Sequence, residues 1–184
     1  MAALTHGHSL GYIPAAFLAL FIAKLYIEMD LEAAYEHTYK VIKKMYGDIS
    51  EFSILEELLE KAVELGNKDT KPIDAIHKLG KGWVAEEALA ISIYCSFRFR
   101  DNFENAIFAA VNHSGDSDST GSITGQIMGT FLGFSNIPDK YKHNLELKDI
   151  LYELCDDIHN GCPYDNNDEL KIKKWKEKYV NIDS

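Results

Sequence analysis

Hydrophobic residues recur every three to four positions along most of the chain, which is the spacing of one face of an α-helix. The pattern is clearest in residues 31–46 and 54–65, each followed by a glycine of the kind that ends helices. Other segments of helical character are residues 15–29, 73–79, 83–97, 103–111, the stretch that follows residue 120, 145–158 and 168–179. No alternating stretch is long enough to indicate a β-strand. The pattern predicts a compact, all-α, multi-helix fold.

The first of these helices is the most apolar. Pro14 suits the first turn of a helix, and residues 15–29 are apolar nearly all round, which predicts burial on several sides. The uninterrupted apolar run, residues 13–23, covers only 11 positions and is too short to span a bilayer. No cationic segment precedes it, so it does not have the character of a secretory signal. We therefore expect no membrane partner.

Composition and charge narrow the class of protein further. A chain of 184 residues with 46% hydrophobic and 26% charged residues is predicted to form a single domain, residues 1–184. The net charge of −10 repels phosphate backbones, so nucleic acid is not an expected partner. Three cysteines without CxxC spacing predict neither a disulfide framework nor a zinc site and fit the cytoplasm.

A strongly polar run, Asn-His-Ser-Gly-Asp-Ser-Asp-Ser-Thr-Gly, occupies residues 112–121 just before a helical segment. Asp116 and Asp118 supply carboxylates, and Ser119 or Thr120 could add a hydroxyl oxygen, which are the ligands that Mg²⁺ prefers. Helix capping also uses such residues, but it needs only one or two of them. The run lacks the spacing of an EF-hand, and no lysine follows its glycines as in a phosphate-binding P-loop. It therefore favours a divalent-cation site.

A stripe of glycines follows this run at intervals of four residues, Gly121, Gly125, Gly129 and Gly133, on one face of a helix. Each glycine lowers the stability of a helix by about 1 kcal/mol relative to alanine. The stripe is therefore expected only where another group must approach the helix closely. Most of the stripe is interpreted as helix packing. Gly121 and Gly125 could also leave room for a ligand.

Two further segments carry side chains that could serve a site. In the segment Thr-His-Gly-His at residues 5–8, His8 is interpreted as a capping or core group, whereas His6 could stack on or hydrogen-bond a substrate. Trp83 with Glu86 and Glu87 could form a pocket wall. The preferred interpretation is that Trp83 anchors the core and that the two acids favour the positive end of a helix dipole.

Three segments together resemble the ADP-ribosylglycohydrolases related to dinitrogenase reductase activating glycohydrolase. They are residues 3–8 (Ala-Leu-Thr-His-Gly-His), 82–88 (Gly-Trp-Val-Ala-Glu-Glu-Ala) and 111–121, in the family's order between residue 2 and about residue 158. The resemblance implies an all-α fold with a binuclear Mg²⁺ (or Mn²⁺) site. It also implies hydrolysis of the glycosidic bond between ADP-ribose and a side chain of an ADP-ribosylated protein.

The same resemblance assigns roles residue by residue. Asp116 and Asp118 would be catalytic metal ligands, and Ser119 would supply a hydroxyl oxygen to the metal. His6 would contact ADP-ribose, while Gly115 and Ser117 would line the ribose and diphosphate side of the cleft. Serine rather than threonine at position 119 is similar to arginine-directed members and favours ADP-ribosyl-arginine as the substrate.

The chain resembles only the second half of the family. Gly-Asp-x-x-Gly and Thr-Asp-Asp-Thr elements, which supply the remaining metal ligands, have no counterpart here. Asp116, Asp118 and Ser119 would serve one Mg²⁺ poorly and two not at all. We expect an N-terminal half to be missing from the fold and an apolar face on residues 15–26 to be exposed, so that a homodimer or a partner chain covers it. The alternatives are a non-catalytic ADP-ribose or nucleotide-binding module and a helical interaction domain.

Overall fold

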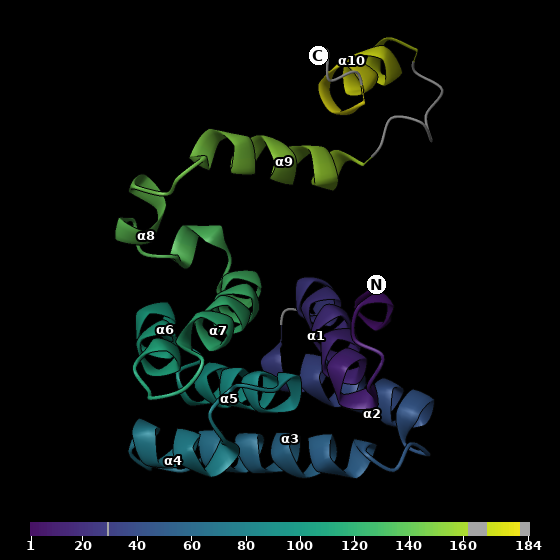
Figure 1. Cartoon of the computed structure of the whole chain (residues 1–184). Helices are drawn as coiled ribbons and strands as arrows, with labels where there is room; N and C mark the ends of the chain where they lie inside the picture. The colour runs from purple at the N-terminus through teal and green to yellow at the C-terminus, as the bar shows by residue number, and fades with distance from the viewer. Residues whose placement is uncertain (29, 162–168, 181–184) are drawn as a thin grey trace. The chain divides into compact units, whose positions relative to one another are not determined.

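The structure, a computed structural model, describes residues 1–28, 30–161 and 169–180, which fall into two compact units. Throughout these ranges the regular elements are helices and no strand occurs, which confirms the predicted all-α class (Figure 1). Residues 1–138 form the first unit and residues 139–184 belong to the second. The first contains η1 (Ala2–Leu4), α1 (Ser9–Glu28), α2 (Leu31–Tyr46), α3 (Phe52–Gly66), α4 (Pro72–Leu79), α5 (Ala85–Arg98), α6 (Phe103–Val111), α7 (Ser117–Leu132) and η2 (Phe134–Asn136). The second contains α8 (Lys140–His143), α9 (Lys148–Asn160) and α10 (Glu169–Tyr179).

Most helices lie where the hydrophobic pattern places them. Helices α2 and α6 begin and end at the predicted residues, and α3, α4, α5, α9 and α10 do so within three residues at each end. The short helix α8 was not predicted. Residues 162–168, which include most of the turn between the last two helices, lie outside the described residues. Whether residues 1–184 form a single domain stays a prediction.

Helix α1 begins earlier than predicted. It begins at Ser9, so Pro14 lies in its second turn rather than its first. The start is capped by His8, whose Nδ1 accepts a hydrogen bond from the backbone N–H of Leu10 at 3.2 Å, which confirms the capping role of that histidine.

Burial of α1 is also narrower than predicted, because one stripe enters the core: Leu10, Ile13, Pro14, Phe17, Phe21 and Leu25. The opposite face is exposed and apolar, as expected for residues 15–26, and includes Ala15, Ala19, Ala23 and Tyr26. Coverage of that face by another chain stays a prediction.

By length and composition alone, α1 could cross a membrane, since it is 20 residues long with a mean hydropathy of 1.8. The uninterrupted apolar run of 11 residues therefore underestimated the length of helix that is apolar enough to span a bilayer. A core helix or a signal sequence passes the same test, and 33% of the apolar window is buried inside the protein. A single helix of this kind is weak evidence for membrane insertion.

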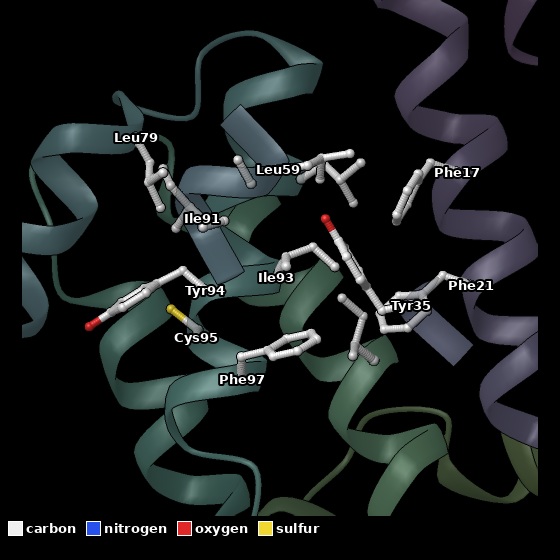
Figure 2. Close-up of a cluster of buried hydrophobic side chains, with 14 of the residues drawn as sticks. Phe17, Phe21, Tyr35, Leu59, Leu79, Ile91, Ile93, Tyr94, Cys95 and Phe97 are labelled. Atoms are coloured by element: carbon white, nitrogen blue, oxygen red, sulfur yellow. The ribbon is translucent and has the colours of Figure 1, made fainter. Parts of the chain in front are cut away.

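The core of the first unit is built around α5, in which every residue from Ala88 to Phe97 is buried. Helices α1, α3, α6 and α7 all pack against it. Figure 2 shows Phe21 of α1, Tyr35 of α2 and Phe97 of α5 meeting in an aromatic group, with ring centroids 6.2 Å apart for Phe21 and Tyr35 and 5.4 Å for Tyr35 and Phe97. Because α5 is surrounded, its apolar residues occur on all sides and it carries no one-sided stripe.

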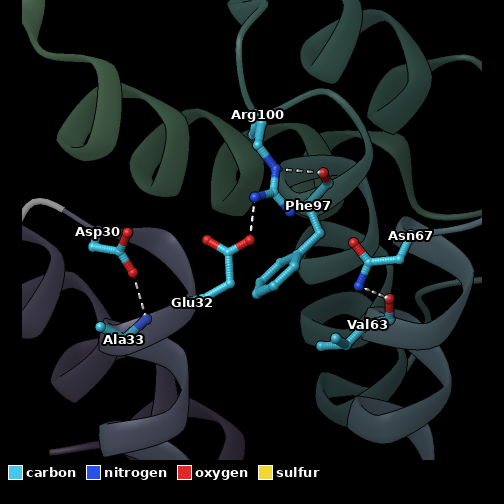
Figure 3. Close-up of polar contacts among 7 residues, drawn as sticks. All are labelled: Asp30, Glu32, Ala33, Val63, Asn67, Phe97 and Arg100. Atoms are coloured by element: carbon cyan, nitrogen blue, oxygen red, sulfur yellow. Dashed lines mark hydrogen bonds and ion pairs between the residues drawn. The ribbon is translucent and has the colours of Figure 1, made fainter.

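Polar contacts join α2 to the chain that leaves α5 (Figure 3). Asp30 caps α2 by accepting a hydrogen bond from the N–H of Ala33 at 2.7 Å. In the first turn of α2, Glu32 pairs with the guanidinium of Arg100, whose Nε also donates to the carbonyl oxygen of Phe97 at 3.4 Å. These contacts fix the far end of α5, opposite the end at which the polar run lies.

We predict that Phe21→Ala lowers the free energy of unfolding by about 3–5 kcal/mol, because the substitution leaves a cavity at a fully buried position. Urea denaturation of the whole chain measures this change. The control is Ile27→Ala on the exposed side of the same helix, where 71% of the side chain is accessible, and its effect should stay within about 0.5 kcal/mol. Similar losses for both variants would contradict the assignment of the buried stripe.

Candidate functional site

The loop between α6 and α7 is held together by His113. Its Nδ1 accepts a hydrogen bond from the backbone N–H of Gly115 at 3.1 Å, so Nε2 carries the proton and donates to the hydroxyl of Thr120 at 3.0 Å. The Thr120 hydroxyl in turn reaches the carbonyl oxygens of Ala110 and Asp116, at 2.7 and 2.8 Å. Sequence reasoning found no partner for His113. The only available signal was its place two residues before Gly115 in the polar run.

The pKa of His113 lies below its ordinary value, chiefly because partial burial disfavours the charged imidazolium. Hydrogen bonding to the carbonyl of Ala110 and the nearby charge of Asp116 oppose this effect. The neutral ring is therefore the form that holds the loop.

The loop lies directly against the turn that precedes α5. The N–H of Asp116 donates to the carbonyl oxygen of Lys81 at 2.8 Å. A Cβ placed on Gly115 would lie 1.8 Å from the same oxygen, so no other residue fits there without moving the backbone. Gly115 therefore has a structural reason to be glycine in addition to its predicted contact with substrate.

Glu87 fixes that turn from the first turn of α5. Its Oε2 accepts hydrogen bonds from the N–H groups of Lys81 and Gly82, at 2.9 and 3.0 Å. Gly80 and Gly82 adopt positive φ angles of 126° and 78°, which side-chain-bearing residues rarely adopt. Glu86 and Glu87 are first-turn acids of α5, as predicted. Glu87 also closes the turn, which the sequence did not indicate.

The carboxyl groups of Asp116 and Asp118 lie side by side at the start of α7. The pKa of Asp118 lies below its ordinary value, chiefly through its side-chain interaction with Asp116 and also because the backbone N–H groups of residues 118 and 119 stabilise its carboxylate. Asp116 occupies the N-cap position, yet its side chain makes no capping hydrogen bond. Capping therefore does not explain the Asp116 side chain.

A pocket of about 270 Å³ opens beside these residues. Asp116 and Ser119 contribute its polar side chains, and the rest of the wall comes from α1, the start of α5 and α7: Pro14, Ala15, Leu18, Gly82, Trp83, Val84, Ala85, Ala88, Leu89 and Ile123. Trp83 lines the pocket with 69% of its surface exposed. The prediction that it anchors the core is therefore wrong. The Gly80–Gly82 turn brings the chain out to the surface two residues before α5 begins.

The remaining predicted site residues lie near the loop or before α1, outside the lining of this pocket. The Ser117 hydroxyl is 3.4 Å from the carbonyl oxygens of both His113 and Gly115. His6 is exposed, and its Nδ1 lies 2.8 Å from the hydroxyl of Thr5. The roles assigned to His6, Gly115, Ser117, Ser119 and the two aspartates stay predictions.

Gly121 and Gly125 of the α7 stripe lie against α6. A Cβ on Gly121 would lie 2.6 Å from Cγ1 of Val111, and one on Gly125 would lie 3.7 Å from Cδ1 of Ile107, both on α6. The suggestion that Gly121 and Gly125 leave room for a ligand is therefore wrong, since α6 fills that space. Gly133 ends α7 with a φ of 77°.

The donor set at the loop is smaller than a complete metal site. Within the described ranges, no group of three or more His, Cys, Asp or Glu side chains is placed to hold a metal ion. Two adjacent carboxylates and a serine hydroxyl fit part of the oxygen-rich coordination of Mg²⁺ or Mn²⁺, which normally takes six ligands. The residues fit one side of such a site and leave the other side to further ligands.

Comparison with known proteins agrees with the class that the helical fold and the Asp-rich loop indicate. The profile of the family "ADP-ribosylglycohydrolase" matches residues 1–167. The chain belongs to the ADP-ribosylglycohydrolase family.

Several relatives are similar to parts of the chain. ADP-ribosylhydrolase ARH3 of Homo sapiens is 23% identical over 173 residues, covering 79% of this chain and 46% of that protein. ADP-ribosylarginine hydrolase Tri1 of Serratia proteamaculans is 36% identical over 63 residues, covering 34% and 17%. An uncharacterized protein of Archaeoglobus fulgidus is 31% identical over 107 residues, covering 58% and 33%. The chain thus spans at most about half the length of these relatives. No solved structure is significantly similar to it.

We predict that Gly115→Ala destabilises the protein by about 1–3 kcal/mol, because the new methyl group would overlap the Lys81 carbonyl. Urea denaturation measures the change. Gly7→Ala is the matched control, since a Cβ there meets nothing within 4 Å. Equal stability of the two variants would show that the loop does not lie against Lys81.

We also predict a contribution of His113 to the pH dependence of stability. Because its pKa is lower in the folded state, the unfolded chain binds the proton more readily. The contribution is present above the unfolded pKa of about 6.5 and is lost as the pH falls below it. Urea denaturation between about pH 7.5 and pH 5 should therefore show a steeper loss of stability for the wild type than for His113→Gln. Parallel curves for the two proteins would contradict this role.

Proposed function

We propose that this chain carries the metal-binding loop of an ADP-ribosyl hydrolase, which cleaves the glycosidic bond between ADP-ribose and a protein side chain. The observation that carries the proposal is the pair of adjacent carboxyl groups of Asp116 and Asp118, at the edge of a pocket that Asp116 and Ser119 line. Membership of the ADP-ribosylglycohydrolase family supports the same activity.

The two carboxylates would hold Mg²⁺ or Mn²⁺, with the Ser119 hydroxyl as a third oxygen. Adjacent carboxylates repel each other when both are ionised, and a dication offsets that repulsion. Such a cation, when bound, supplies Lewis-acid polarisation of an oxygen atom. Further ligands to the cation would come from water, the substrate or other residues. A second metal ion in the same site would depend on such ligands more than the first.

The start of α7 would receive the ADP-ribose. The positive end of a long helix favours a diphosphate, and Gly115 and Ser117 lie at that end of α7. His6, exposed before α1, would add a side-chain contact to the same ligand. An ADP-ribosylated protein in the cytoplasm is the proposed partner, and a second chain is proposed to cover the exposed face of α1.

Arginine is the proposed linkage. Residue 119 is serine, which is similar to arginine-directed members of the family. A relative that is named an ADP-ribosylarginine hydrolase is 36% identical over 63 residues of the chain. Both features point to ADP-ribosyl-arginine among the possible substrates.

A second function is a module that binds ADP-ribose without cleaving it. It is favoured by one observation, the lack of a third His, Cys, Asp or Glu beside the two aspartates in the part of the chain that the structure describes. In that case ADP-ribose binding would not depend on a metal.

Thermal denaturation of the chain with Mg²⁺, ADP-ribose or both separates the two functions. The hydrolase predicts stabilisation by ADP-ribose that requires Mg²⁺ and turnover of an ADP-ribosyl-arginine peptide. Asp118→Asn should abolish both, since it removes a carboxylate from the metal site. Asp48→Asn, an exposed residue with the same change of charge, is the control and should change neither.

Stabilisation by ADP-ribose without metal, and without turnover, would assign the binding module. Stabilisation by neither ligand would reject both functions in favour of an interaction domain.

A further inference from the structure

The side chains that line the pocket beside Asp116 are apolar except for those of Asp116 and Ser119. Pro14 and Leu18 of α1 and Ile123 of α7 form aliphatic walls, and Trp83 adds a broad aromatic face. Asp116 and Ser119 contribute the carboxylate and the hydroxyl. Such a pocket suits a ligand with an apolar stem and a polar end, because each part meets a surface of its own kind.

Trp83 lines the same pocket as Asp116 and Ser119. A Cβ on the preceding residue, Gly82, would lie 3.6 Å from Cβ of Asp116, so the chain passes Asp116 immediately before it reaches Trp83. The indole is 69% exposed although the neighbouring Gly82 is buried. The turn held by Glu87 therefore presents a large aromatic surface next to the proposed reacting groups.

We propose that Trp83 and this pocket receive the arginine side chain from which ADP-ribose is removed. The inference rests on the proposed function and names the part of the substrate that this surface recognises. A guanidinium group is planar, delocalised and weakly hydrated, and it stacks on aromatic faces. The three methylene groups behind it pack on apolar walls, which Pro14, Leu18 and Ile123 supply.

The chemistry places the guanidinium near the carboxylates. Hydrolysis breaks the bond between the anomeric carbon of the ribose and a guanidino nitrogen. Water gives its hydroxyl to the carbon and a proton to the nitrogen, so arginine is the leaving group. The guanidinium is thus joined directly to the reacting carbon, whereas the adenine lies at the opposite end of ADP-ribose. A surface adjacent to Asp116 therefore lies closer to the arginine leaving group than to the adenine.

A serine-linked substrate would use this surface poorly. Serine leaves through a single hydroxyl group and has neither a planar cation nor a three-carbon stem. Trp83 therefore acts as a specificity-determining residue that favours arginine linkages.

The test compares the affinities of the whole chain for two probes in Mg²⁺, before appreciable hydrolysis. The probes are a peptide ADP-ribosylated on arginine and free ADP-ribose, and the variants are Trp83→Ala and Trp83→Phe. We expect Trp83→Ala to weaken binding of the arginine-modified peptide about tenfold and Trp83→Phe about threefold. Affinity for free ADP-ribose should stay within about twofold of the wild type, because that probe lacks the guanidinium. Phe108→Ala, which removes an aromatic residue of 65% exposure outside the pocket, should change neither affinity.

The outcomes separate this inference from the function on which it rests. If Trp83→Ala weakens both probes equally, the indole contacts ADP-ribose itself and the inference is overturned. It is also overturned if the variant weakens neither probe. If the wild type binds neither probe, the proposed function fails and the inference fails with it.

Discussion

The site depends on one backbone contact, the hydrogen bond from the N–H of Asp116 to the carbonyl of Lys81. It joins the loop before α7 to the turn before α5, and it forms only because Gly115 has no side chain to hold the two segments apart. Glu87 secures one side of the contact and His113 the other. The positions of the carboxylates and of Trp83 follow from this junction.

The two carboxyl groups at this junction have an electrostatic cost. Adjacent carboxyl groups at Asp116 and Asp118 repel each other when both are ionised, and a folded protein retains such a pair only if other groups compensate. Backbone N–H groups and the positive end of α7 provide part of that compensation. A bound dication would provide the remainder, which agrees with the preference of Mg²⁺ for carboxylate oxygens.

Much of the fold could be predicted because local signals were strong. Helices α2 and α6 combine one-sided hydrophobic spacing with capping residues, and their ends were predicted correctly. The start of α1 was not, because its apolar residues lie on every face and His8 is a less common cap than Ser or Asp. The hydrogen bonds of His113 and the exposure of Trp83 depend on contacts between segments distant in the sequence. The stripe of glycines could be read as space, but only the structure shows that Val111 occupies it.

The burial of α5 on all sides from Ala88 to Phe97 limits how the length of the chain can vary. Successive residues of an α-helix are rotated by about 100° about its axis. Loss of one residue inside α5 would turn Glu87 away from the Gly80–Gly82 turn, or else turn the aromatic group around Phe97 out of its packing. Both ends of the helix are thus locked to the same angular register. A change of length in the segment between α5 and α6 would leave the register of α5 intact and would instead disturb the pairing of Arg100 with Glu32.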